Sequence, residues 1–227
     1  MIIGGIQKSS LIDFPEKISA IIFTQGCNFR CAYCHNPELL QSKQTDFSFA
    51  NVIDFLKTRI GKLDGVVITG GEPTLHQDLA ECLAQIKNLG FAIKLDTNGT
   101  NPLMLKNLIE KGLVDYVAMD IKAPIEKYPD VIGLDISINK ILESIDILKN
   151  SGIEYEFRTT VLKKFLCEND FEKIGELLNG AKKYYLQKFV STKILDKSLE
   201  NETNYTDDEF EIFAQNLNKK IQYVGIR

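Results

Sequence analysis

Three cysteines stand close together near the start of the chain, at Cys27, Cys31 and Cys34, within eight residues. Their spacing is C-x3-C-x2-C, and they follow directly after the apolar run Ala20 to Thr24. Cysteine thiolates are the usual protein ligands of iron–sulfur clusters, and a four-iron cluster normally takes four of them. A tight loop with three thiolates would leave one iron without a protein ligand. We therefore predict a [4Fe–4S] cluster with one iron open to a substrate or cofactor.

A structural zinc site is the alternative for such a segment, and it needs a fourth ligand to complete its tetrahedron. His35 adjoins Cys34 and is too close to chelate comfortably beside it, while Cys82 and Cys167 each stand alone. We expect these last two to be ordinary buried or surface residues. Because the five cysteines are odd in number and three are crowded together, metal binding in a reducing compartment is favoured over disulfides.

Polar residues follow a second apolar run, Gly65 to Thr69, in the order Gly70, Gly71 and Glu72. Two glycines would let the backbone approach a ligand closely, and the carboxylate could meet a ligand ammonium. Any tight turn can use a Gly-Gly pair, so this segment is weak evidence by itself.

Two later apolar runs end in Asp96 with Asn98, and in Asp120 with Lys122. Each pair has an ordinary explanation, either a polar turn with an Asn-Gly step or a solvated ion pair. Arg158 lies inside an apolar run, where an arginine usually faces a ligand carboxylate or phosphate, or reaches solvent. Because side chains alternate along a strand, Arg158 is expected to face the same site.

The segments that must position these residues alternate between apolar, β-branched runs and amphipathic stretches. Strands typical of a parallel sheet covered on both faces are expected at residues 20–24, 65–69, 91–95, 116–119, 155–161 and 184–190. Helices are expected at residues 49–60, 78–88, 102–111, 139–150, 170–178 and 206–217, followed by a short apolar tail at 221–226. Asn101-Pro102 is typical of a helix start, and Gly90 and Gly112 of helix ends.

Six such β-α units predict an α/β fold with right-handed crossovers. Six strands are too few for the full eight-stranded barrel, which leaves a partial (β/α)6 barrel or an open sheet. If the fold is a partial barrel, functional residues should lie at the carboxyl ends of the strands. All 227 residues are expected to form a single domain, because no Pro/Gly/Ser-rich linker interrupts the chain.

Composition narrows the class of protein. A formal net charge of -4 and an isoelectric point near 5.4 argue against a nucleic-acid-binding protein with a broad basic surface. No apolar run approaches the roughly 18 residues that span a bilayer, and the first residues do not resemble a signal peptide. We expect a cytoplasmic protein without membrane or nucleic-acid partners.

The C-x3-C-x2-C segment, with an aromatic residue at Tyr33, resembles the signature of the radical S-adenosylmethionine (SAM) superfamily. In that family the open iron chelates the amino and carboxylate groups of SAM, and the reduced cluster cleaves SAM to methionine and a 5′-deoxyadenosyl radical. The resemblance implies a partial barrel of radical SAM type. It also implies SAM contacts from the following residues: Tyr33, Gly70, Gly71, Glu72, Asp96, Asn98, Lys122 and Arg158. In related activating enzymes, aspartates matching Asp96 and Asp120 can hold a monovalent cation near the SAM carboxylate.

The continuation Cys34-His35-Asn36-Pro37 resembles activases that install a glycyl radical on a partner enzyme. The leader at residues 4–15 and the segments at 67–75 and 115–124 are similar to the group that activates anaerobic ribonucleoside-triphosphate reductase. This likeness, over residues 4–195, implies that reductase as partner and a flavodoxin or ferredoxin as electron donor. A radical SAM enzyme acting on a small molecule, such as a purine precursor, and a cluster- or zinc-bearing binding module without catalysis remain the alternatives.

Overall fold

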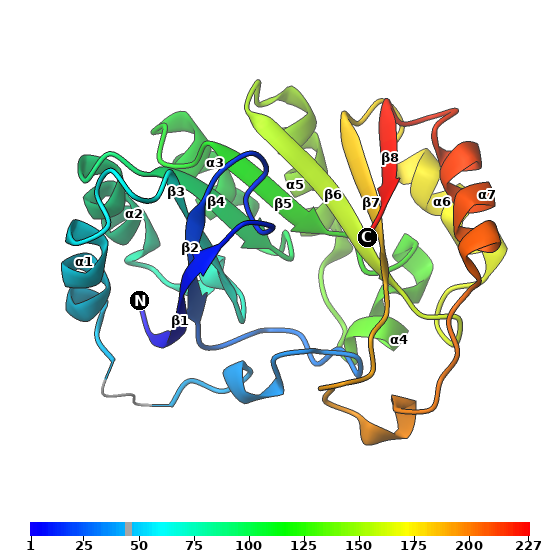
Figure 1. Ribbon diagram of the computed structural model, residues 1–227. Coiled ribbons are helices and arrows are strands. Elements are labelled where there is room, and N and C mark those ends of the chain that lie inside the picture. Colours follow the sequence, from blue (N-terminus) through cyan, green and yellow to red (C-terminus); the bar gives the residue numbers. More distant parts are fainter. Residues whose placement is uncertain (44–46) are drawn as a thin grey trace.

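The computed structural model describes residues 1–43 and 47–227, which contain one sheet of eight strands (Figure 1). The strands are β1 (Ile3–Ser10), β2 (Ser19–Thr24), β3 (Gly65–Gly70), β4 (Ala92–Thr97), β5 (Tyr116–Asp120), β6 (Glu154–Val161), β7 (Lys183–Lys188) and β8 (Tyr223–Ile226). They lie in the sheet in chain order, β1 antiparallel to β2 and all later neighbours parallel. All the carboxyl ends of β2 to β8 therefore meet at one edge of the sheet.

Seven α-helices are described, and most of them connect consecutive parallel strands. They are α1 (Phe49–Lys57), α2 (Leu79–Asn88), α3 (Pro102–Glu110), α4 (Tyr128–Ile132), α5 (Ile138–Asn150), α6 (Glu168–Leu177) and α7 (Asp207–Leu217). Asn101 caps α3 by accepting a hydrogen bond from the Met104 amide, with Pro102 in the first turn, as the sequence predicts. In the described part of the chain, no helix combines the length and apolar character needed to cross a membrane.

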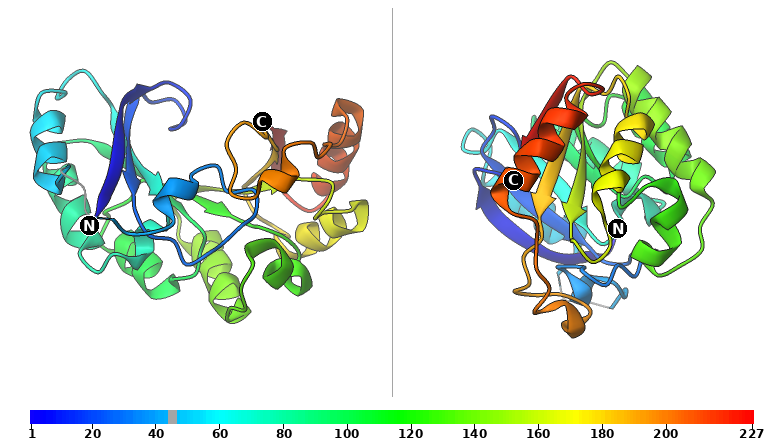
Figure 2. Two further views of the ribbon diagram at one scale, coloured as in Figure 1. Left: turned by 90° about the horizontal axis from the view of Figure 1, so that it is seen from below. Right: turned by 90° about the vertical axis from the view of Figure 1, so that its right-hand side faces the viewer.

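The sheet is strongly curved and open, with helices along its convex side and β1 and β8 at its two ends (Figure 2). This arrangement confirms the predicted α/β partial barrel, and the six expected strands are β2 to β7. Two edge strands extend it. The apolar tail expected at residues 221–226 contains β8, and β1 was not predicted. Residues Ile3–Ser10 read IGGIQKSS, which has no sustained apolar pattern, so only pairing with β2 makes this segment a strand. The short helix α4 was not predicted either.

The two faces of the sheet bury different kinds of side chain. Towards the helices lies the main core, to which the strands contribute residues such as Ile22, Ile68 and Val117. The concave face carries a much smaller apolar cluster of Phe14, Ile21, Val67 and Tyr116. Because strand side chains alternate between faces, the concave face nearer the carboxyl ends is left to polar residues.

Candidate active site

A cavity of about 460 Å³ lies at the carboxyl edge of the sheet, where the strand ends converge on the loop after β2. Every residue that the sequence singled out lines this cavity: Cys27, Cys31, Tyr33, Cys34, Gly70, Gly71, Glu72, Asp96, Asn98, Asp120, Lys122 and Arg158. Asp13, Thr97, Thr160 and Gln187 add to its wall. Parts of the chain more than 150 residues apart in sequence are therefore brought together by the parallel topology alone.

The cysteine loop is held in place by its own backbone and by neighbouring segments. Cys34 donates its amide hydrogen to the Cys31 carbonyl over 2.9 Å, which closes a tight turn around the three thiols. Arg30 donates its amide hydrogen to the Ile132 carbonyl at the end of α4, over 2.9 Å. The Asp196 amide donates a hydrogen bond to the Ala32 carbonyl over 2.9 Å, so the segment after β7 also packs on the loop.

All three thiols are free of disulfides, Cys31 is buried, and Cys27 and Cys34 are half-buried. Burial raises the pKa of the Cys27 thiol to about 12, against a partial lowering by the Phe29 amide that donates to its sulfur over 3.4 Å. Burial also raises the pKa of Cys31 and Cys34. Thiols of this kind ionise readily only when a metal takes the place of the proton, which is the condition for cluster ligands.

The donor set fits an iron–sulfur cluster better than a single zinc ion. Within residues 1–43 and 47–227, no three His, Cys, Asp or Glu side chains are arranged to hold one metal ion. A cluster instead takes one thiolate on each of three irons, so its cysteines need not converge on a point. The His35 Nε2 lies 2.8 Å from the Val190 carbonyl, a position that does not serve the cysteines. Cys82 lies buried in α2 and Cys167 at the start of α6, and neither lines the cavity.

The two glycines after β3 are explained by contact between backbones. A Cβ on Gly71 would lie 2.1 Å from the Gly26 carbonyl oxygen, and one on Gly70 would lie 2.5 Å from the Thr24 backbone. Gly70 also has a φ of +115°, which residues with side chains rarely adopt. The sequence assigned these glycines to ligand approach; the structure adds that they let the turn pack directly under the cysteine loop.

Glu72 is 1% exposed, and its carboxylate collects hydrogen bonds from two strand ends. It accepts from the Thr74 hydroxyl over 2.5 Å and the Thr74 amide over 3.1 Å, from the Thr97 hydroxyl over 2.7 Å and from the Asn98 amide over 2.6 Å. Burial raises the pKa of Glu72, and these hydrogen bonds partly offset that effect. The sequence predicted an anion available to a ligand; the structure shows a carboxylate that also ties β3 to β4.

Asn98 extends this connection to the cysteine loop. Its side-chain amide nitrogen donates to the side-chain oxygen of Asn28 over 2.8 Å, and the side-chain nitrogen of Asn28 donates to the Thr100 hydroxyl over 2.9 Å. Asn28 and Thr97 were not picked out from the sequence, because neither pattern nor composition distinguishes them from ordinary loop residues.

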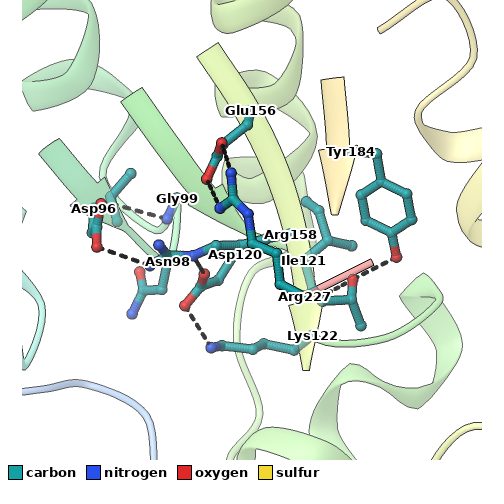
Figure 3. Close-up of polar contacts among 12 residues, drawn as sticks. Asp96, Asn98, Gly99, Asp120, Ile121, Lys122, Glu156, Arg158, Tyr184 and Arg227 are labelled. Carbon is teal, nitrogen blue, oxygen red and sulfur yellow. Dashed lines mark hydrogen bonds and ion pairs between the residues drawn. The ribbon is translucent and has the colours of Figure 1, made fainter. Parts of the chain in front are cut away.

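A row of charges crosses the concave face from β4 to β6 (Figure 3). Arg158 bridges two carboxylates, with its Nε 2.5 Å from Asp120 and its terminal nitrogen 3.1 Å from Asp96. Lys122 lies 2.8 Å from the second Asp120 oxygen, and Lys94 lies 2.5 Å from the second Asp96 oxygen. Burial acts to raise the pKa of both aspartates, but the basic neighbours outweigh it and lower each pKa below its ordinary value.

Lys94 was missed at the sequence level, although a lysine two residues before Asp96 in an apolar strand was a readable signal. Its presence changes the expectation of a bound monovalent cation, because all four oxygens of Asp96 and Asp120 already contact a basic group. A second buried carboxylate, Glu156, is held by Arg227 at 2.8 and 3.0 Å and by the Tyr116 hydroxyl at 2.8 Å.

Comparison with known proteins places this site in a family. A family model described as the radical SAM superfamily matches residues 21–178. A Methanocaldococcus jannaschii protein named "Putative glycyl-radical enzyme activating enzyme MJ1227" is 37% identical over 235 residues, which cover 100% of this chain and 95% of that protein. A second protein of that organism, with the same description and the designation MJ1632, is 31% identical over 183 residues, 79% of this chain and 69% of its own length.

Among solved structures, Streptococcus suis SuiB bound to the precursor peptide SuiA superposes with a TM-score of 0.68 at 12% identity, over 91% of this chain and 48% of SuiB. At that identity the likeness concerns the fold alone. The matched region of the family model holds the cysteine loop and the ends of β2 to β6, the same elements that enclose the cavity. The chain therefore belongs to the radical SAM superfamily, whose enzymes use a [4Fe–4S] cluster and SAM.

Proposed function

We propose that this protein is an activase that cleaves SAM reductively and installs a glycyl radical on a partner enzyme. The observation that carries the proposal is the 37% identity, over the whole chain, to a protein named as a glycyl-radical enzyme activating enzyme. Anaerobic ribonucleoside-triphosphate reductase is the proposed partner, and a flavodoxin or ferredoxin is the proposed electron donor. The cytoplasmic setting expected from the sequence is part of the same proposal.

In this proposal Cys27, Cys31 and Cys34 hold the cluster, since they are the thiols that line the cavity. Bound together and reduced, cluster and SAM supply a one-electron cleavage that yields a carbon-centred radical able to abstract hydrogen. The glycine turn and Glu72 lie beside the loop and would receive the SAM amino group.

The remaining wall would bind and orient the rest of SAM. Arg158 and Lys122 offer positive charge to a carboxylate, and both lie on the cavity wall with little exposure. The row of charges has a formal net charge of 3 − 2 = +1. Its basic groups are Lys94, Lys122 and Arg158, and its acidic groups are Asp96 and Asp120. A buried excess of positive charge favours an anionic ligand group. Tyr33 and Asn98 complete the proposed SAM contacts.

The loop between β1 and β2 favours a polypeptide substrate over a small molecule. Leu11 is 75% and Ile12 is 89% exposed, although the next residue, Asp13, lines the cavity. The loop is not free: Ser10 donates its hydroxyl hydrogen to the Asp13 carboxylate and accepts one from the Ile12 amide over 3.2 Å. Phe14 anchors it in the concave face. An apolar pair held in solvent, directly before a residue that lines the cavity, suits contact with another protein.

Electron paramagnetic resonance tests this function. Anaerobic enzyme with SAM, a reductant and the reductase of the same organism should give a glycyl doublet, with one 5′-deoxyadenosine formed for each radical. If SAM is cleaved but no glycyl-radical enzyme of that organism is activated, the activase proposal is wrong and the small-molecule alternative gains.

A double substitution locates the partner surface. Leu11→Ser with Ile12→Ser should lower the rate of partner activation at least about tenfold, as loss of a central apolar contact does at interfaces, and leave SAM cleavage without partner unchanged. The matched control is Leu103→Ser with Ile212→Ser, two exposed apolar residues on the outer helices α3 and α7. Equal activation rates in both double variants would remove this loop from the partner surface.

A further inference from the structure

Lys94 is a buried cation without an evident structural need. It lies in β4 and is 3% exposed, and the residues on either side of it in the strand, Ile93 and Leu95, are fully buried. Lysine is among the residues least often buried, because its ammonium loses strong hydration. Within residues 1–43 and 47–227, its ammonium pairs with the Asp96 carboxylate, at 2.5 Å. Lys94 does not itself line the cavity, so a ligand there would meet it only through Asp96.

Asp96 stands between two cations of different kinds. One oxygen contacts Lys94 and the other contacts Arg158, which also holds Asp120. Arg158 lines the cavity and is the group that an anionic ligand would attract. If Arg158 turns towards a ligand, Asp96 keeps a compensating charge only because Lys94 is present. An inorganic cation would be needed at this carboxylate in the absence of that lysine.

We propose that Lys94 is a built-in counterion that fixes Asp96 and makes SAM binding by this protein independent of monovalent cations. Lys94 is thus a positioning residue, and the ammonium group takes the place that the family resemblance would give to sodium or potassium. This inference rests on the proposed function only in that the cavity binds SAM; it does not require the activase role.

The decisive measurement is SAM affinity of the cluster-loaded enzyme, without partner, in salts of equal ionic strength. Potassium, sodium and choline chloride are compared, because choline is too large and poorly coordinating to bind a carboxylate site. The unaltered enzyme should bind SAM with the same affinity, within about twofold, in all three salts.

Lys94→Met keeps the length of the side chain and removes its charge, which lowers the sum of the row from +1 to 2 − 2 = 0. This variant should lose SAM affinity at least about tenfold in choline, the order expected when a buried charge loses its partner, and regain it in potassium or sodium. Lys106→Met is the control, since its ammonium is exposed and lies 3.8 Å from Glu110 on the surface of α3. It should behave as the unaltered enzyme in every salt.

Three outcomes overturn the inference. The first is a requirement of the unaltered enzyme for potassium or sodium, which is measurable even if Lys94→Met fails to fold. The second is a Lys94→Met protein that binds SAM normally in choline. The third is a folded Lys94→Met protein that no cation rescues, because Lys94 would then be only a structural residue. Failure of the unaltered, cluster-loaded enzyme to bind SAM in any salt would instead overturn the proposed function, and the counterion role with it.

Discussion

Replacing Glu72 should destabilise the junction between the cysteine loop and the sheet, even when no ligand is bound. In Glu72→Ala, the amides of Thr74 and Asn98 and the hydroxyls of Thr74 and Thr97 lose their acceptor inside the protein. An unsatisfied buried donor costs about 1–3 kcal/mol. The two hydroxyls can turn to other acceptors, so we count only the two amides, and relief of the buried charge offsets part of their cost. We expect a loss of about 2–5 kcal/mol, a large part of the roughly 5–15 kcal/mol that stabilises a typical domain.

Urea denaturation of the anaerobic protein, followed by circular dichroism, measures this loss. Glu72→Gln keeps one acceptor oxygen and should lose about 1–3 kcal/mol, because its amide nitrogen would face a donor. Glu81→Ala is the control, since Glu81 is exposed on α2 and such changes stay within about 0.5 kcal/mol. Iron content should fall with stability, because Asn98 also holds Asn28 in the cysteine loop. A Glu72→Ala protein as stable as Glu81→Ala would refute the hydrogen-bonding role argued here.

Two further predictions concern the cluster and the charged row. Replacing Cys27, Cys31 or Cys34 by Ala should abolish the binding of about four irons per chain and the visible charge-transfer absorption. Cys82→Ala and Cys167→Ala should retain both. Stoichiometric zinc with no iron uptake by the unaltered protein would contradict the cluster. Because the pKa of Asp120 is lowered below its ordinary value of 3.8 in the folded protein, its ionisation contributes stability above about pH 4 that is lost as the pH falls. The melting temperature of Asp120→Asn should therefore be lower at pH 7 but fall less as the pH is taken from about 5 towards 1, roughly the range over which the stability from a salt-bridged aspartate is lost. Parallel curves for the two proteins would show that the ion pairs of Asp120 are not those described.

Local patterns in the sequence determined most of the fold. The six central strands are apolar runs that any parallel sheet would bury, and helix starts such as Asn101-Pro102 depend on neighbours in the chain. The cysteine spacing and the polar residues after each run also identified the cavity wall, because the carboxyl ends of parallel strands must meet at one edge.

Only the tertiary structure decided what each polar group contacts. Strand β1 needs β2 as a partner, since its own residues do not form an apolar pattern. Glu72 reaches Asn98 across 26 positions of sequence, and Arg158 reaches Asp96 across two strand pairings, distances at which sequence spacing carries no geometric information. The same is true of Lys94. Burying a lysine is unfavourable by itself. Only the contact with the Asp96 carboxylate, which Arg158 holds from its other side, explains why Lys94 is buried here.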